Sequence, residues 1–229
     1  MCSNFSKKNT MTTLTLDFLR DLNQNNNKDW FEKNKKTYEK AYKGEFLIFI
    51  QRLIDEVKLF DPVVNDLAKD SLFRIYRDVR FSNDKTPYKP YFSAIISKGG
   101  RKGMDYPGYY IQLEQGSLSI GGGAYFLEKE PLLKARTYIL NHQDEFLSII
   151  NDKNFIQHYE SVKGEKNARL DANFKAIAAE VPLIFNKQFY VMAEIDPKIV
   201  LEENGIAQIL NYCKAMKPFN DFFTKAVFA

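Results

Sequence analysis

Side chains that can bind an anion or transfer a proton are concentrated in one short segment, residues 74–89. The segment holds five cations and two carboxylates in sixteen residues. Guanidinium and ammonium groups at this density bind phosphate or carboxylate groups, and a neighbouring carboxylate orients them. The candidate ligand-binding residues of the segment are Arg74, Arg77, Arg80, Ser82, Lys85 and Lys89. We therefore expect a site for an anionic small molecule here.

Three further side chains of the segment are candidates for catalysis. Asp78 and Asp84 are the carboxylates able to act as a base or to hold Mg²⁺, and Tyr88 is able to donate a proton. The sequence contains neither a P-loop nor a dinucleotide-binding fingerprint, so it indicates no nucleotide cofactor. Whether the protein is an enzyme, and which reaction it would catalyse, stays open at this stage.

The same segment alternates between apolar and charged residues with the period of a β-strand, which predicts a strand near residues 72–81. One side of this strand would carry Phe73, Ile75, Val79 and Phe81, and the other Arg74, Tyr76, Asp78 and Arg80. Arg77 falls on the apolar side, where an unpaired guanidinium is costly, so we expect an acidic or carbonyl partner for it. The charged side should be concave or partly covered, and lined by Tyr76 and residues 109–120.

The predicted strand is followed by a turn that contains Asp84, which can brace the backbone, and Pro87, which stiffens the exit. Further along, Gly121, Gly122 and Gly123 end a predicted hairpin. Their amides would form an anion-binding nest around Gly122 if they face the same side as the cations. The alternative use of the glycines is a bulge or a tight hairpin exit.

Two other functions compete with the anion site. In the first, the protein is a scaffold or interaction module, and Arg77, Asp78 and Arg80 only form ion pairs across the sheet with Glu114. In the second, the protein associates with nucleic acid, and tyrosines beside the cations stack on bases. Those tyrosines are Tyr76, Tyr88, Tyr91, Tyr109 and Tyr110. The net charge of +4 is mild for a nucleic-acid-binding protein.

The charged segment also carries a recognisable motif. It reads Arg74-x-x-Arg77-Asp78-x-Arg80-Phe81-Ser82-x-x-Lys85-x-Pro87-Tyr88. This pattern resembles the signature of domain-of-unknown-function family 2461, a family of bacterial proteins of about this length. The resemblance extends over about residues 14–227 and includes the Asn-Asn-x-x-Trp-Phe segment at 26–31. It implies little about activity, because the family's function is unassigned.

The composition indicates a folded protein without a metal centre or a disulfide framework. Apolar residues make up 45% of the 229-residue chain and aromatic residues 14%. The two histidines, His142 and His158, are sixteen positions apart on separate predicted helices, so neither a histidine-based triad nor a histidine-rich zinc site is predicted. Cys2 and Cys213 show neither the spacing of metal ligands nor that of a disulfide scaffold.

Hydropathy predicts a cytoplasmic protein that does not interact with membranes. The most apolar stretch, residues 46–50, is far too short to cross a bilayer, and residues 1–10 lack the apolar centre of a signal peptide. We expect a flexible tail over residues 1–12 and a single α+β domain over 13–229. The sequence indicates no particular oligomeric state.

The order of the elements follows from changes in hydrophobic period. Helical periods are predicted from residue 16 to 60, including a helix that begins after the N-cap Asn27, and again from residue 130. The predicted strands lie near 72–81, 91–97, 108–115 and 117–122, with a further edge strand near 188–195. Two helical segments, 205–216 and 218–227, close the chain. The expected fold is therefore an antiparallel β-meander of four to five strands, covered by N-terminal and C-terminal helices.

Overall fold

An antiparallel sheet organises the fold. The computed structural model describes residues 11–80 and 83–228. Within these residues the sheet has four strands in the order β1-β2-β3-β4. They are β1 (Tyr91–Ile96), β2 (Gly108–Glu114), β3 (Ser117–Ala124) and β4 (Phe189–Ile195). Strands adjacent in sequence are adjacent in space, so the predicted meander and the α+β class are confirmed.

Helices precede, follow and interrupt the strands. Before the sheet come α1 (Thr13–Gln24), α2 (Lys28–Lys33), α3 (Lys35–Glu39), the π-helix η1 (Lys40–Phe46), α4 (Leu47–Val57) and α5 (Ala68–Ser71). The later helices are α6 (Lys129–Asn141), α7 (Gln143–Ile150), α8 (Lys153–Tyr159) and α9 (Gly205–Phe228). Short 3₁₀ turns are η2 (Gly100–Gly103), η3 (Ala172–Phe174), η4 (Ile177–Ala179), η5 (Pro182–Phe185) and η6 (Pro197–Leu201).

Polar side chains fix where the first helices begin. Thr12 caps α1, where its hydroxyl accepts a hydrogen bond from the backbone N–H of Leu14. Asn27 caps α2 in the same way, because its side-chain oxygen accepts from the N–H of Trp30 at 2.9 Å. Each cap satisfies a backbone donor that the helix itself leaves without a partner. The predicted N-cap at Asn27 is confirmed.

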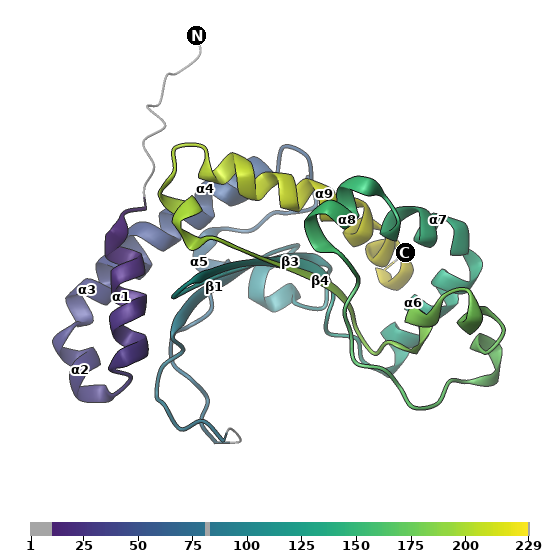
Figure 1. Ribbon diagram of the computed structural model, residues 1–229, viewed down its shortest axis with the longest axis horizontal. Coiled ribbons are helices and arrows are strands. Elements are labelled where there is room, and N and C mark those ends of the chain that lie inside the picture. Colours follow the sequence, from purple (N-terminus) through teal and green to yellow (C-terminus); the bar gives the residue numbers. More distant parts are fainter. Residues whose placement is uncertain (1–10, 81–82, 229) are drawn as a thin grey trace, which may run out of the picture.

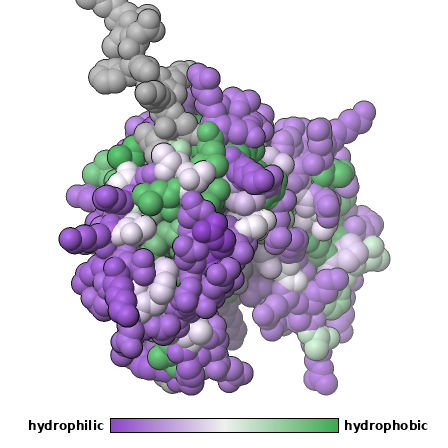
Figure 2. All heavy atoms as spheres, turned by 60° about the vertical axis from the view of Figure 1, so that its left-hand side comes forward, coloured by the Kyte–Doolittle hydropathy of each residue, from purple (hydrophilic) through white to green (hydrophobic). Residues whose placement is uncertain are grey.

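The long helices α4 and α9 cover one face of the sheet (Figure 1). Helices α1 to α3 lie at one end of the sheet, and α6 to α8 lie at the other (Figure 1). The end that carries α1 to α3 has a mostly hydrophilic surface, on which hydrophobic residues form only small areas (Figure 2). None of the helices in the described part of the chain combines the length and the apolar character that crossing a membrane requires.

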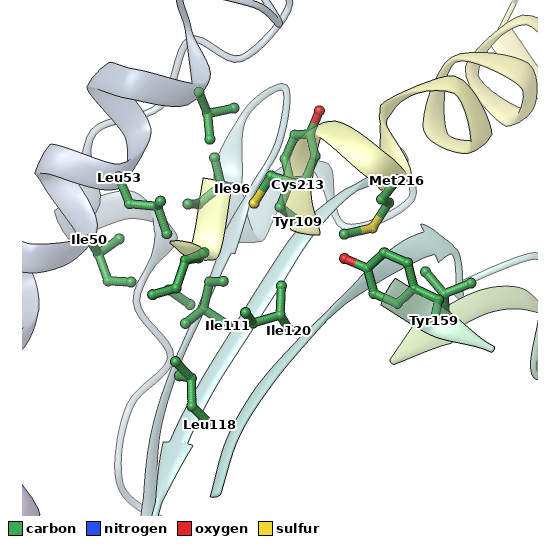
Figure 3. Close-up of a cluster of buried hydrophobic side chains, with 14 of the residues drawn as sticks. Ile50, Leu53, Ile96, Tyr109, Ile111, Leu118, Ile120, Tyr159, Cys213 and Met216 are labelled. Carbon is green, nitrogen blue, oxygen red and sulfur yellow. The ribbon is translucent and has the colours of Figure 1, made fainter. Parts of the chain in front are cut away.

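The core lies between the covered face of the sheet and helices α4 and α9. Leu53 from α4 and Met216 from α9 meet side chains of the sheet, among them Ile111 and Ile120, which are fully buried (Figure 3). Because successive residues of a strand point to opposite faces, the residues between them, such as Tyr110, belong to the other face. That second face contains the candidate site described below.

Helix α9 differs from the prediction of two separate segments. It runs unbroken from Gly205 to Phe228 with Pro218 inside it. A proline removes one backbone hydrogen bond and usually kinks or ends a helix. Here Phe219, Phe222 and Phe223 are buried directly after the proline. Burial of three aromatic side chains stabilises the helix across the break, which local sequence preference does not capture.

The predicted strand over residues 72–81 is wrong, although the segment is extended. Residues 72–80 and 83–90, here called the arm, pair at isolated points only: Leu72 with Ala94 of β1, and Tyr76 with Tyr88 within the arm. The arm projects from the sheet on the side opposite α4 and α9 (Figure 1). Pro87 and Pro90 lie in its returning branch, and a proline cannot donate to a strand ladder.

The side chains of the arm alternate in exposure as the sequence predicts, but not all of the apolar ones reach the core. Ile75 is buried, whereas Phe73 and Val79 are only half-buried. Phe73 contacts the second face of the sheet, not the face covered by helices. Phe81 lies outside the described residues.

Glycines in β3 let α9 approach the sheet closely. A Cβ atom at Gly122 would collide with the carbonyl oxygen of Gly108 and with the sulfur of Met216. Asn220 of α9 donates a hydrogen bond to the same carbonyl oxygen of Gly108 at 3.1 Å. The glycines therefore serve close packing of the strand against its neighbours and the helix.

We predict that Gly122→Ala lowers the free energy of unfolding by about 1–3 kcal/mol, because the added methyl overpacks the contact between sheet and helix. Gly44→Ala is the matched control, since the nearest atom to a Cβ there is the carbonyl oxygen of Glu39 at 4.0 Å. That variant should be neutral or stabilised by up to about 1 kcal/mol. Denaturant unfolding measures both, and equal effects of the two substitutions would contradict the packing role.

Candidate functional site

A cavity of ≈ 400 Å³ lies on the second face of the sheet, away from α9. Residues from all four strands, the arm and the loop between β1 and β2 line it. Its lining comprises Phe73, Lys89, Tyr91, Ser93, Ile95, Met104, Tyr106, Gly108, Tyr110, Gly122, Gly123, Tyr125, Phe126, Tyr190 and Met192. A cavity of this size, apolar with a few polar groups, is typical of small-molecule sites.

Strand register explains the shape of the cavity. Gly108, Gly123 and Tyr190 lie side by side on β2, β3 and β4. In the next row Tyr110 lies opposite Gly121. A Cβ atom at Gly108 would collide with the carbonyl oxygen of Ile96, and one at Gly123 with the carbonyl oxygen of Phe189, so both positions require glycine, while the tyrosines stand at the sides. The cavity therefore combines a bare backbone floor with aromatic walls.

The loop between β1 and β2 closes one side of the cavity. Tyr106 from this loop stacks on Phe228 of α9, with ring centroids 3.7 Å apart. The buried carboxylate of Asp66 accepts a hydrogen bond from the backbone N–H of Ser97 at 2.9 Å and so holds the start of the loop. Burial raises the pKa of Asp66, and hydrogen bonds from the loop partly offset that effect. The sequence analysis did not identify this carboxylate.

Two aromatic residues after β3 form an exposed rim. Tyr125 and Phe126 are each about half exposed, and their rings meet edge to face with centroids 5.0 Å apart. Tyr125 also contacts the ring of Tyr190 inside the cavity at 5.1 Å. Exposed aromatic residues at a cavity mouth add apolar contact area for a ligand.

Inside the cavity, Tyr110 provides a hydroxyl group on a short polar chain. Its hydroxyl donates to the side-chain oxygen of Gln112 at 2.7 Å, and the amide of Gln112 donates to Glu114 at 3.4 Å. Burial raises the pKa of Tyr110 to about 12. The hydroxyl therefore stays protonated at neutral pH and serves as a hydrogen-bond donor.

Lys89 is the charged residue of the cavity lining. Its backbone N–H donates to the carbonyl oxygen of Ile75 at 2.8 Å, which fixes it on the arm. Its ammonium nitrogen lies 5.7 Å from the ring centre of Phe73 and 5.9 Å from that of Tyr91. Within the described part of the chain, this nitrogen has neither a hydrogen-bond acceptor nor a carboxylate partner. Burial, and then the charges of Arg74 and Arg77, lower the pKa of Lys89.

Three of the predicted site residues instead hold the arm together. Arg77 forms an ion pair with Asp84 at 2.9 Å, which confirms the expectation of an acidic partner. Thr86 donates to Asp84 through its backbone N–H and its hydroxyl, and these bonds, followed by the charge of Arg77, lower the pKa of Asp84. Lys85 donates to the carbonyl oxygen of Val79 at 2.9 Å. These contacts join the two branches of the arm.

The Arg77–Asp84 pair is partly exposed, with 24% of the arginine side chain accessible. Its contribution to stability should therefore be small, well below the cost of breaking a fully buried pair. The predicted pairing of the arginines with Glu114 is not what the structure has. Arg77 and Arg80 form ion pairs with carboxylates of the arm, and Glu114 accepts a hydrogen bond from the amide of Gln112.

Arg80, Asp78 and Arg74 lie on the outside of the arm. The guanidinium of Arg80 binds Asp78 at 3.0 and 2.7 Å, and these hydrogen bonds lower the pKa of Asp78 to about 2. The side chain of Arg80 is 75% exposed. Arg74 is also exposed, and it makes no hydrogen bond or ion pair with the described residues. None of the three residues lines the cavity on the second face of the sheet, and Ser82 lies outside the described residues.

Tyr88 is packed into the core at the base of the arm. Only 4% of it is exposed, and its ring stacks on that of Phe31 with centroids 4.0 Å apart. Asn26 accepts a hydrogen bond from the backbone N–H of Tyr88 at 3.1 Å and donates to its carbonyl oxygen at 2.9 Å. The Asn-Asn-x-x-Trp-Phe segment at 26–31 therefore clamps the arm through Asn26.

The tyrosines considered for base stacking are not available as one surface. Tyr88 and Tyr109 are buried, and the hydroxyl of Tyr109 donates to Asp61 at 2.7 Å. Tyr76 contacts the rings of Phe31 and Tyr88. Tyr91 and Tyr110 line the cavity instead. The five tyrosines therefore do not form one continuous surface.

The protein is an α+β protein whose four-stranded sheet is covered by helices on one face. Its candidate ligand site is the aromatic cavity on the other face, beside the arm. The sequence model of the family described as "Conserved hypothetical protein (DUF2461)" matches residues 14–222. The chain therefore belongs to this family. No curated protein and no solved structure matches the chain. Among the described residues, no cluster of three or more side chains is arranged to hold a metal ion.

We predict that Asn26→Asp lowers the free energy of unfolding by about 1–3 kcal/mol, because the new carboxylate loses the donor and faces the carbonyl oxygen of Tyr88. The neighbouring Asn27→Asp should be nearly neutral, since aspartate caps a helix as well as asparagine does. Thermal and denaturant unfolding compare the pair. If the two variants lose equal stability, the clamp on Tyr88 has no special role.

Proposed function

We propose that the cavity binds a small molecule in which an apolar, ring-bearing body is joined to a carboxylate or phosphate group. The observation that carries this proposal is the position of Lys89. Its ammonium group lines an aromatic cavity and has no acceptor or carboxylate partner among the described residues. A half-buried cation without a counter-ion is costly, and an anionic ligand removes that cost.

The surrounding charges support an anion at this end of the cavity. Arg74 and Arg77 lie near enough to Lys89 to affect its protonation. Arg77 is neutralised by Asp84, but Arg74 is not paired with any carboxylate in the described residues. The arm thus brings more positive than negative charge to the cavity. A ligand anion at Lys89 would be stabilised by the charges of both Lys89 and Arg74.

The aromatic lining supports an apolar body with a ring. Tyr110, Tyr125 and Tyr190 surround the glycine floor, where a planar group can lie on bare backbone. Aromatic pairs stabilise a contact by about 0.5–1.5 kcal/mol beyond the area they bury. In this proposal the signature residues Arg77, Asp84 and Lys85 act indirectly, because they hold the arm that presents Lys89.

We predict that hydrocinnamate and phenyl phosphate bind to the protein, while hydrocinnamyl alcohol, which has the same body without the charge, binds much more weakly. Isothermal titration calorimetry gives the dissociation constants. Lys89→Met keeps the apolar stem and removes the charge, so it should weaken binding of both anions about ten- to a hundredfold, as expected for a charge-assisted hydrogen bond of about 1.5–3 kcal/mol.

Arg80→Met is the control, because it removes an exposed arm cation that does not line the cavity. It should leave the dissociation constants unchanged. Binding that survives Lys89→Met but is lost in Arg80→Met would move the anion site to the outer side of the arm. Absence of binding for the anions and the alcohol alike would argue against the cavity as a site for this class of ligand.

A further inference from the structure

The surroundings of Lys89 also suit a reactive amine. Imine formation requires a neutral amine, and an ordinary lysine is neutral in only about one molecule in 2,500 at pH 7. Enzymes increase this fraction by placing a lysine in an apolar pocket or next to other cations. Lys89 meets both conditions, since it lines an aromatic cavity and has Arg74 and Arg77 nearby.

Competing interactions that would hold the amine protonated are weak. The rings of Phe73 and Tyr91 lie at 5.7 and 5.9 Å, near the outer limit of a cation–π contact. The carboxylate of Glu114, opposite Tyr91 on β2, accepts a hydrogen bond from Gln112 and makes no ion pair with Lys89. By contrast, the neighbouring Lys85 is bound to a carbonyl oxygen of the arm.

We propose that Lys89 forms an imine with an α-keto acid whose apolar body fills the cavity. This inference rests on the proposed function, because the same cavity must first bind the carboxylate. The keto acid follows from the arrangement of charges. The reacting amine lies next to the arm, whose Arg74 and Arg77 are near enough to lower its pKa, so the carbonyl that the amine attacks and the carboxylate drawn by this positive charge must be adjacent.

The chemistry is balanced without an oxidant, a reductant or a metal. The neutral amine of Lys89 adds to the keto carbon, and the resulting carbinolamine loses its hydroxyl group as water when the C=N bond forms. The departing oxygen needs a proton. Tyr91 lines the same cavity, and its hydroxyl stays protonated because burial raises its pKa, so it can supply this proton.

Reductive trapping tests the proposal. The intact protein is incubated with phenylpyruvate and cyanoborohydride, and the modified lysine is located by peptide mass spectrometry. The expected result is one adduct per chain, on Lys89, formed faster than any adduct on Lys98. Lys98 is the matched control, because it also contacts a cavity tyrosine, Tyr106, but is exposed. The preference for Lys89 should be greatest near neutral pH and should fall as the pH approaches about 10.4, where ordinary lysines also lose their protons, because the pKa of Lys89 is lowered.

Lys89→Arg separates reaction from binding, because arginine keeps the positive charge but offers no amine for imine formation. The variant should lose trapping while it still binds hydrocinnamate. Adducts distributed over exposed lysines, or no adduct in a protein that binds hydrocinnamate, would overturn the imine and leave the proposed function intact. If neither hydrocinnamate nor phenylpyruvate binds, both proposals are overturned.

Discussion

The close contact between α9 and the glycines of β3 is the constraint on which the rest of the structure depends. Met216 and Asn220 approach the backbone at Gly122 and Gly108, which no larger residue at position 122 would allow. This contact commits one face of the sheet to the core shared by α4 and α9. On the other face, the backbone at Gly108 and Gly123 forms part of the cavity lining. Glycines of β2 and β3 therefore contribute to both the packed and the open side.

The open side is completed by segments that are not regular strands. The arm adds Phe73 and Lys89, and the loop after β1 adds Met104 and Tyr106. Neither segment has a continuous ladder of backbone hydrogen bonds, so side chains hold them in place. Ion pairs and hydrogen bonds within the arm, together with those from Asn26, hold the arm in place. The hydrogen bond from Ser97 to Asp66 holds the loop in the same way. Arg77, Asp84 and Lys85 of the charged signature hold the arm together, and Lys89, which directly follows the signature, reaches the cavity.

Much of the fold could be predicted because its signals are local. Strict alternation along β2 and β3, with a turn at Gly116, predicts their hairpin, and Asn27 marks the start of α2. The arm was predicted wrongly as a strand because its alternation was given more weight than Pro87 and Pro90. The continuous α9 was missed for a different reason, since only tertiary burial of the aromatic residues after Pro218 stabilises that helix.

The candidate site was predicted only in part. Lys89 was named from its neighbourhood in sequence, as was Gly122. The remaining walls come from positions as distant as Phe73 and Tyr190, and no periodicity connects them. The cavity exists because the register of four strands brings these rings into adjacent rows, which is a property of the folded sheet. The two arginines that looked most like ligands, Arg74 and Arg80, lie outside on the arm.

Chemical-shift mapping tests whether a ligand of this protein occupies the open face of the sheet. Backbone amide signals are recorded while phenyl phosphate is titrated into the isotopically labelled protein. If the cavity is the site, the largest shifts belong to Tyr110, Gly123 and Tyr190, with Lys89 alongside them. Shifts centred instead on Arg80 and Lys85, with the sheet unaffected, would contradict it and place binding on the exposed arm.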